Sequence, residues 1–230
     1  MATDLSSHVL DPQQWGMKAA RLSEVALLGL PVPPGLGLSP TDLTSSPSEA
    51  ARALNTWVEL YRPQRVVVRT SAGEDLLHTA HAGRTVSLLN CPADPAALLQ
   101  AIMHELLPLG PQTAVPGASI MVQQQVEAPL YGVAFYGAKH LSVEASSAPD
   151  GITSGTKPSV CAGATGRRIT ARWEQGMLPN LALVRRIGSL CSQLSEHFGF
   201  EVDVEWAWTG ATVVVLQVRP VTRPLTGWAA

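Results

Sequence analysis

Two stretches of this chain, far apart in the sequence, place charged side chains at the ends of strongly apolar runs. The first reads VVVRTSAGED from Val66 to Asp75, and the second pairs DVEWA at 203–207 with LQVRP at 216–220. Runs of β-branched and aromatic residues are typical of buried strands. Buried polar groups are costly unless they have hydrogen-bond partners. Arg, Glu or Gln at the end of a buried strand therefore indicates a partner, either another side chain or a ligand. We therefore expect these strands to build a binding site.

Composition limits the class of protein. The chain has 230 residues, of which 46% are apolar and 15% charged, so it is globular with room for one large domain or two lobes. Its net charge of -2 provides no basic field for nucleic acid. Three widely spaced cysteines, Cys91, Cys161 and Cys191, indicate reduced thiols and fit neither a disulfide framework nor a zinc site. Without a signal peptide or a long apolar run, we expect a cytoplasmic protein that does not bind membranes.

Hydrophobic periodicity and breaker residues predict a mixture of helices and strands. Helices are expected at 15–29, 46–61, 94–107 and 181–197, and strands at 66–69, 118–125, 132–136, 141–144, 201–206 and 212–218. The residues between 70 and 84 are expected to form a polar loop. The Ser-, Gly- and Pro-rich stretch 146–166 is expected to be a long loop or flap.

Two basic residues are candidates for binding phosphate. Lys18 lies in the first turn of the first predicted helix, where free N–H groups and the helix dipole favour an anion. The alternative is an ordinary solvated lysine. Arg69 ends a run of three valines, so its guanidinium needs a partner, either a carboxylate such as Glu74 or Asp75 or a bidentate phosphate. The residues alone leave both alternatives open.

The C-terminal hairpin is a candidate magnesium site. Glu205 and Gln217 supply the oxygen ligands that Mg²⁺ prefers. We expect Glu205 to lie opposite Val215 and Asp203 opposite Gln217, through a bulge or an odd-length turn at 208–211. Glu205 and Gln217 would then be diagonal neighbours about 7–8 Å apart. The alternative is that Asp203 and Glu205 face water on an edge strand.

Several ordered motifs resemble those of one enzyme family. They are GMKAARL at 16–22, GLPVPPG at 29–35, VRTSAGED at 68–75, HAGRTVSLL at 81–89, IMVQQQV at 120–126, YGVAF at 131–135, DGITSG at 150–155, DVEWA at 203–207 and LQVRPVT at 216–222. In this order they resemble the ATP-binding domain of the phosphoenolpyruvate synthase, pyruvate phosphate dikinase and rifampin phosphotransferase family. The chain is thereby identified as a shortened, stand-alone homologue of that domain.

The resemblance implies an α+β, ATP-grasp-like fold in which two lobes, 1–126 and 127–230, clasp Mg-ATP. It implies that Lys18 and Arg69 bind the phosphates and that Gly83 lies in a lid loop over them. Residues that meet the adenine would be Gln123, Gln125 and Val126. Mg²⁺ would be held by Glu205 and Gln217, and Arg219 would meet the transferred phosphoryl group, which makes Arg69 and Arg219 the catalytic candidates.

Departures from the family leave three functions open. Arg84 replaces the usual Gln, and the histidine and substrate domains of the multidomain relatives are missing. The first function is an ATP-dependent phosphotransferase component that acts on a separate phosphohistidine and substrate-domain protein or on a small molecule. The second is an ATP-grasp ligase that activates a carboxylate as an acyl phosphate. The third is a non-enzymatic module that binds a nucleotide or a partner.

Overall fold

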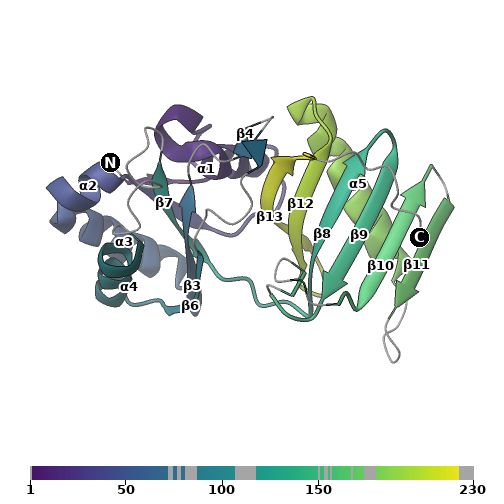
Figure 1. Cartoon of the computed structure of the whole chain (residues 1–230). Coiled ribbons are helices and arrows are strands. Elements are labelled where there is room, and N and C mark those ends of the chain that lie inside the picture. Colours follow the sequence, from purple (N-terminus) through teal and green to yellow (C-terminus); the bar gives the residue numbers. More distant parts are fainter. Residues whose placement is uncertain are drawn as a thin grey trace. The chain divides into compact units, whose positions relative to one another are not determined.

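The chain forms two compact units, Met1–Gln125 and Val126–Ala230, each built on its own antiparallel sheet (Figure 1). The computed structural model describes residues 2–71, 75–76, 79–80, 87–106, 118–149, 151–152, 155, 157–166, 168–173 and 180–222. Both units combine helices with antiparallel strands, so the chain belongs to the α+β class.

Unit 1 contains a five-stranded sheet in the order β1-β2-β7-β3-β6. Its strands are β1 (Thr3–Asp4), β2 (Gly35–Leu38), β3 (Arg65–Ser71), β6 (Ser87–Pro92) and β7 (Ser119–Gln124), with a separate pair β4 (Asp75–Leu76) and β5 (Thr79–Ala80). Its helices are α1 (Pro12–Leu27), α2 (Pro40–Ser45), α3 (Pro47–Tyr61), α4 (Pro95–Ala101) and the π-helical turn η1 (Ile102–Leu106).

The two faces of the unit 1 sheet have different covers. One face presents apolar side chains such as Val66, Val68 and Val122 to the buried residues of α2, α3 and α4. Because side chains alternate along a strand, Arg69 and Ser71 of β3 lie on the opposite face. That face contacts α1, whose Ala19 N–H donates a hydrogen bond of 3.2 Å to Ser71 Oγ.

Helix α1 is interrupted where it crosses the sheet. The helix begins at Asp11, which caps it by accepting from Gln13 N–H. Gly16 then adopts φ 75° and ψ 162°, a conformation that residues with a Cβ avoid, so the helical path restarts at Met17. Trp15 packs on Gly37 of β2, where an added Cβ would lie 3.0 Å from the indole ring. Lys18 is thus in the first turn of the restarted helix.

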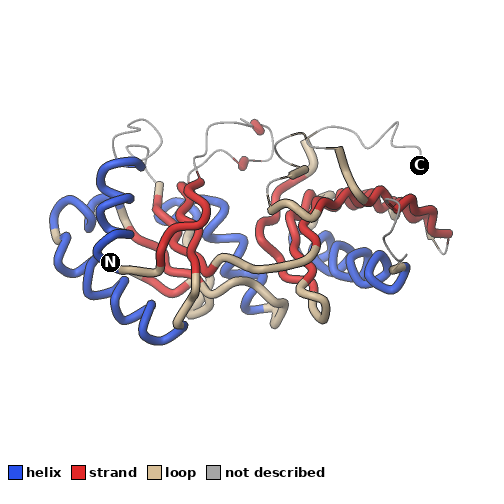
Figure 2. Tube along the Cα trace, turned by 90° about the horizontal axis from the view of Figure 1, so that it is seen from below, coloured by secondary structure: helices blue, strands red, loops and turns tan. Residues whose placement is uncertain are grey.

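Unit 2 contains a six-stranded sheet in the order β11-β10-β9-β8-β12-β13. Its strands are β8 (Leu130–Gly137), β9 (His140–Ser146), β10 (Val160–Thr165), β11 (Arg168–Trp173), β12 (Val202–Trp208) and β13 (Val213–Pro220). Helix α5 (Leu181–Phe198) lies along one face of this sheet, as the edge-on view shows (Figure 2). It begins at Asn180, whose side chain accepts from Leu183 N–H at 2.9 Å, and ends at Gly199.

The structure departs from the sequence prediction at small-residue segments. The expected flap at 146–166 contains strand β10, which pairs with β9 and with β11. The central CAGA residues of β10 lack the β-branched side chains that are typical of strands. Hydrogen bonding to β9 and β11 on either side gives this segment its strand conformation. Strand β2 was also missed, since its sequence is GLGL. The expected helix at 94–107 ends in the π-helical turn η1.

Candidate functional site

The α1 face of the unit 1 sheet gathers polar groups under the helix break. Ser71 and Ser119 are directly paired at the ends of β3 and β7. Ser119 Oγ donates to the carbonyl oxygen of Trp15 at 2.6 Å, which holds the helix at the break. Lys18, between these two anchor points, is only 6% exposed. The solvated alternative for Lys18 is therefore wrong, because the restarted helix carries it inward.

Two side chains on the α1 face of the unit 1 sheet carry buried N–H groups that lack an acceptor among the described residues. Arg69 is half-buried, and its Nε makes no hydrogen bond. Gln123 is 3% exposed, and its Nε2 likewise makes none. In the register of β3 and β7, Arg69 pairs with Met121 and Val67 with Gln123, so Arg69 and Gln123 are diagonal neighbours on one face. Buried donors without partners are costly, so each favours a bound acceptor: a phosphate oxygen would suit the charged Arg69 Nε, and a ring nitrogen of a nucleotide base would suit Gln123 Nε2.

The segment that joins the two units is tied on both sides. On the unit 1 side, Gln125 exchanges two hydrogen bonds with Asn90, which donates from its backbone N–H at 2.8 Å and accepts at Oδ1 at 2.7 Å. On the unit 2 side, the Tyr131 hydroxyl donates to the carbonyl oxygen of Val126 at 2.8 Å. Both atoms of the Gln125 side-chain amide are thus occupied by Asn90. Of Gln123, Gln125 and Val126, only Gln123 presents a side-chain group without a partner.

The hairpin of unit 2 places Glu205 directly opposite Gln217. This corrects the expected register, in which Glu205 lay opposite Val215. The connection between Trp208 and Val213 has an even length, and the bulge lies instead at Glu205–Trp206, where β13 contributes Leu216 as the extra residue. Gln217 is 6% exposed, and among the described residues neither its amide nor the half-buried Glu205 carboxylate is hydrogen-bonded.

Arg219, which was expected to contact the transferred phosphoryl group, forms an ion pair with Asp203. Its Nε donates to Asp203 Oδ2 at 2.7 Å, and the side chains are 31% and 7% exposed. Asp203 is therefore not at the surface of an edge strand, as the water-facing alternative required. The same carboxylate, together with burial as the larger cause, raises the pKa of the Cys191 thiol on α5.

Several expected site residues lie in parts of the chain that the structure does not describe. Gly83 and the rest of the expected lid lie outside the described residues, as does Glu74. In the part of the chain that the structure describes, no three or more His, Cys, Asp or Glu side chains form a group that could hold a metal ion. Within the same ranges, no helix has the length and apolar character needed to cross a membrane.

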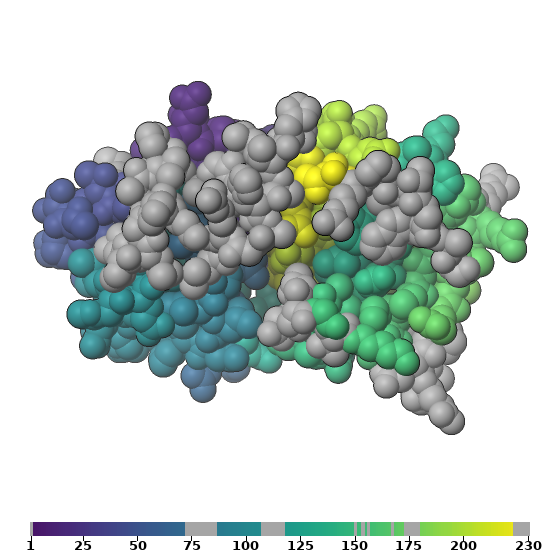
Figure 3. All heavy atoms as spheres, in the orientation of Figure 1, coloured from purple at the N-terminus to yellow at the C-terminus, as the bar shows by residue number. Residues whose placement is uncertain are grey.

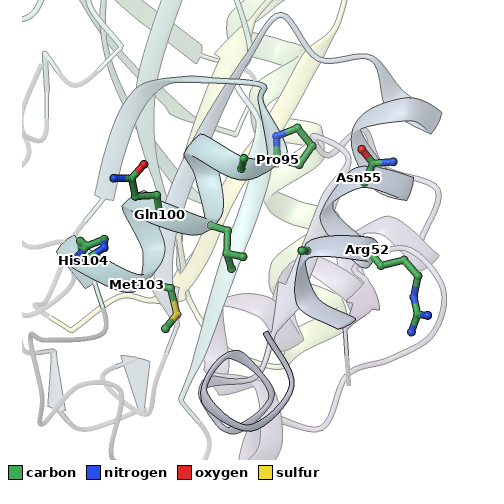
Figure 4. Close-up of a pocket in the computed structure, with 9 residues that line it drawn as sticks. Arg52, Asn55, Pro95, Gln100, Met103 and His104 are labelled. Atoms are coloured by element: carbon green, nitrogen blue, oxygen red, sulfur yellow. The ribbon is translucent and has the colours of Figure 1, made fainter. Parts of the chain in front are cut away.

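An open groove of about 770 Å³ lies between α3 and α4 of unit 1 (Figure 4). Its lining consists of Ala51, Arg52, Asn55, Pro95, Ala96, Leu99, Gln100, Met103 and His104. These helices cover the Val66 and Val68 face of the sheet, whereas Lys18 and Arg69 are on the α1 face. The groove is therefore separate from the candidate phosphate-binding residues.

Comparison with solved structures identifies the fold. A D-alanine–D-alanine ligase from Coxiella burnetii has a TM-score of 0.51 and 11% identity, over 93% of this chain and 49% of the ligase. A D-alanine–D-alanine ligase from Bacillus anthracis, solved in complex with ATP, has a TM-score of 0.51 and 8% identity, over 93% and 57%. The chain has an ATP-grasp-like fold. It spans about half the length of these ligases.

These neighbours correct the family expected from the motifs. They are ligases, not members of the phosphoenolpyruvate synthase, pyruvate phosphate dikinase and rifampin phosphotransferase family, so that assignment is wrong. No protein-family model matches the sequence, and no curated protein matches it. The physical reason is that many of the motif positions are Gly, Pro, Val or Ser at strand ends, helix starts and turns. Such positions restrict residue type in many proteins.

Proposed function

We propose that this chain is an ATP-dependent ligase that activates a small-molecule carboxylate as an acyl phosphate. The observation that carries the proposal is the pair of buried side chains whose donors lack acceptors in the described chain, Arg69 Nε and Gln123 Nε2, on the sheet face covered by α1, in an ATP-grasp-like fold. Helix α1 also carries the buried Lys18. The ligase function is supported over phosphoryl transfer to a partner protein because the similar structures are ligases.

The donor cluster has the chemistry of a phosphate site. Lys18 supplies a compact positive charge, and Arg69 supplies a planar fork that suits phosphate oxygens. The restarted helix adds the positive end of its dipole, which favours the same anion. Three different elements, α1, β3 and β7, hold these groups, so their positions are set by packing before any nucleotide binds. The adenine would meet the segment 123–126, where the Asn90 contacts fix the orientation of Gln125.

Glu205 and Gln217 fit the demands of a magnesium ion. Mg²⁺ is commonly bound through one or two protein oxygens together with phosphate oxygens and water. A half-buried carboxylate faces a buried amide that has no hydrogen-bond partner among the described residues, so both oxygens are available. A magnesium ion held there would supply the charge neutralisation that metal ions contribute to phosphoryl transfer.

The proposed reaction transfers the terminal phosphoryl group of ATP to a carboxylate oxygen of the substrate. The bond between the terminal phosphorus and its bridging oxygen breaks, ADP leaves, and the products are ADP and an acyl phosphate. Attack by an amine on the acyl carbon then releases inorganic phosphate and forms an amide. Arg69 and Lys18 act by holding the phosphates and by offsetting the negative charge on their oxygens, which is the main protein contribution to phosphoryl transfer.

Nucleotide binding gives the first test. Calorimetry with ATP and Mg²⁺ should show binding, and Arg69→Ala should weaken it about tenfold or more, since a charged buried hydrogen bond is worth about 1.5–3 kcal/mol. Arg52→Ala is the matched control, because Arg52 is an exposed arginine of α3, which covers the other face of the sheet, and its carboxylate partner Glu49 is 3.8 Å away. If the wild type shows no heat and no thermal shift at millimolar ATP, the proposed function is wrong.

The reaction class is tested by trapping. With ATP, Mg²⁺ and a panel of carboxylates, hydroxylamine should convert an acyl phosphate into a hydroxamate while ADP accumulates. A phosphorylated product that is stable to hydroxylamine would show a phosphotransferase instead. ATP binding without ADP release on any carboxylate would favour a non-enzymatic module.

A further inference from the structure

The face of the unit 2 sheet opposite α5 carries a continuous row of side chains. Direct pairing across five neighbouring strands links Gln217, Glu205, Val133, Glu144 and Cys161, and continues to Arg172 on β11. Directly paired residues point to the same side of a sheet. The next row, which includes Val204, Ala134 and Val143, lies on the α5 side.

Two carboxylates in this row have no cation. Glu205 and Glu144 are both half-buried, and within the described ranges neither side chain makes a hydrogen bond or an ion pair. Asp203 on the same face contrasts with them, because it is paired with Arg219. Arg172, the cation at the end of the row, donates to Cys161 Sγ at 3.7 Å. The row therefore contains two acceptor groups whose charges are not offset by a cation of the described residues.

The spacing allows both carboxylates to reach one region. Neighbouring strands are about 4.8 Å apart, so the Glu205 and Glu144 backbones are separated by about 10 Å across β8. The residue between them is Val133, which is short, and glutamate side chains can extend over it from both sides. Gln217, buried and without a partner in the described chain, faces the same region from β13. Its amide makes no hydrogen bond to a described residue, so its oxygen is open to a ligand.

We infer that Glu144 is a further ligand of the divalent cation that Glu205 and Gln217 hold, an inference that rests on the metal pair of the proposed function. Three side chains from β9, β12 and β13 then face the ion. This set consists of oxygen donors only, so it suits Mg²⁺ or Mn²⁺ and disfavours zinc. It also predicts that the cation binds without nucleotide, whereas the Glu205 and Gln217 pair would depend on phosphate oxygens.

The test uses Mn²⁺ alone as the probe, with the full chain and no nucleotide. Loss of the free Mn²⁺ signal in electron paramagnetic resonance should report binding by the wild type. Glu144→Gln should weaken Mn²⁺ affinity by at least about tenfold, as even indirect supports of a metal site cost tenfold to a hundredfold. Glu144→Asp keeps the charge on a shorter side chain and should lose less. The matched control is Glu196→Gln, an exposed glutamate on α5 with the same change in charge.

The outcomes separate this inference from the proposed function. If the wild type fails to bind Mn²⁺ alone, or if Glu144→Gln binds it as tightly as the wild type, the role of Glu144 is overturned. ATP binding in calorimetry is measured independently and depends on Arg69, so it can persist in that case. Circular dichroism and thermal unfolding of each variant show whether a lost signal reflects unfolding; if Glu144→Gln is unfolded, the Glu144→Asp result decides.

Discussion

Replacing Arg219 should damage the fold of unit 2 and not only its chemistry. The Arg219 guanidinium is 2.7 Å from Asp203, whose side chain is 7% exposed, between β12 and β13. Arg219→Ala removes this ion pair and leaves a buried carboxylate with less compensation. Removing one partner of a fully buried pair costs about 3–5 kcal/mol. Because Arg219 is 31% exposed, water screens part of the loss, and we expect about 2 kcal/mol.

A loss of this size is measurable. It shifts the folding equilibrium by about thirtyfold. Urea unfolding, with hydrogen exchange followed in peptides that cover 202–220, should report it. Asp203→Asn in the Arg219→Ala background should recover part of the stability, because the amide carries no charge. Arg172→Ala, at an exposed position on β11 with one weak sulfur contact, should change stability by less than about 0.5 kcal/mol. An Arg219→Ala protein as stable as the wild type would refute this reasoning.

Three further predictions concern particular side chains. Gly132→Ala should destabilise the protein by about 3 kcal/mol in urea unfolding, because a Cβ there would lie 2.3 Å from a β9 carbonyl oxygen and 2.5 Å from an indole ring. Gly188→Ala, whose nearest contact would be a leucine methyl at 3.2 Å, should cost less than about 1 kcal/mol. Burial raises the pKa of Cys191, so a thiol reagent at pH 8 should modify this residue only on unfolding. Burial acts to raise the pKa of Asp4, but hydrogen bonds from its neighbours, including the Tyr61 hydroxyl, lower it overall. Asp4 therefore contributes stability above its unfolded pKa near 4 and loses it as the pH falls through the folded pKa. Tyr61→Phe should cost about 1 kcal/mol at pH 7 and less as the pH falls through the folded pKa of Asp4, as measured by urea unfolding.

Elements with a strong local pattern could be predicted from the sequence, and small-residue strands could not. Helices α3 and α5 and strands β3 and β8 lie close to their expected ranges, since their apolar periodicity matches the face that they bury. Strand β10 has little pattern of its own, because Cys161, Ala162 and Gly163 gain their conformation from pairing on both sides. The conformation of such segments is set by pairing with neighbouring strands, which the local sequence does not reveal.

The candidate site was predictable as a set of residues but not as a set of contacts. Arg69 and Gln217 were identified because a polar side chain in an apolar strand is costly to bury unless it binds a partner. The Arg219 ion pair could not be foreseen, because the position of the bulge in β13 decides which residue faces Asp203. Glu144 was missed because its place beside Glu205 depends on the pairing of the β8–β9 hairpin with β12, which is distant in sequence.

The bulge in β13 also protects the sheet from association with other copies of the chain. β13 is a terminal strand of the unit 2 sheet, and its Val213–Val215 run would be a good template for intermolecular strand pairing. The extra residue Leu216 bends this strand, and Pro220 removes a donor at its end. Part of this segment, yellow in Figure 3, is visible at the surface of the molecule. Deletion of Leu216 would keep Gln217 opposite Glu205 but straighten the strand, so the predicted cost is aggregation.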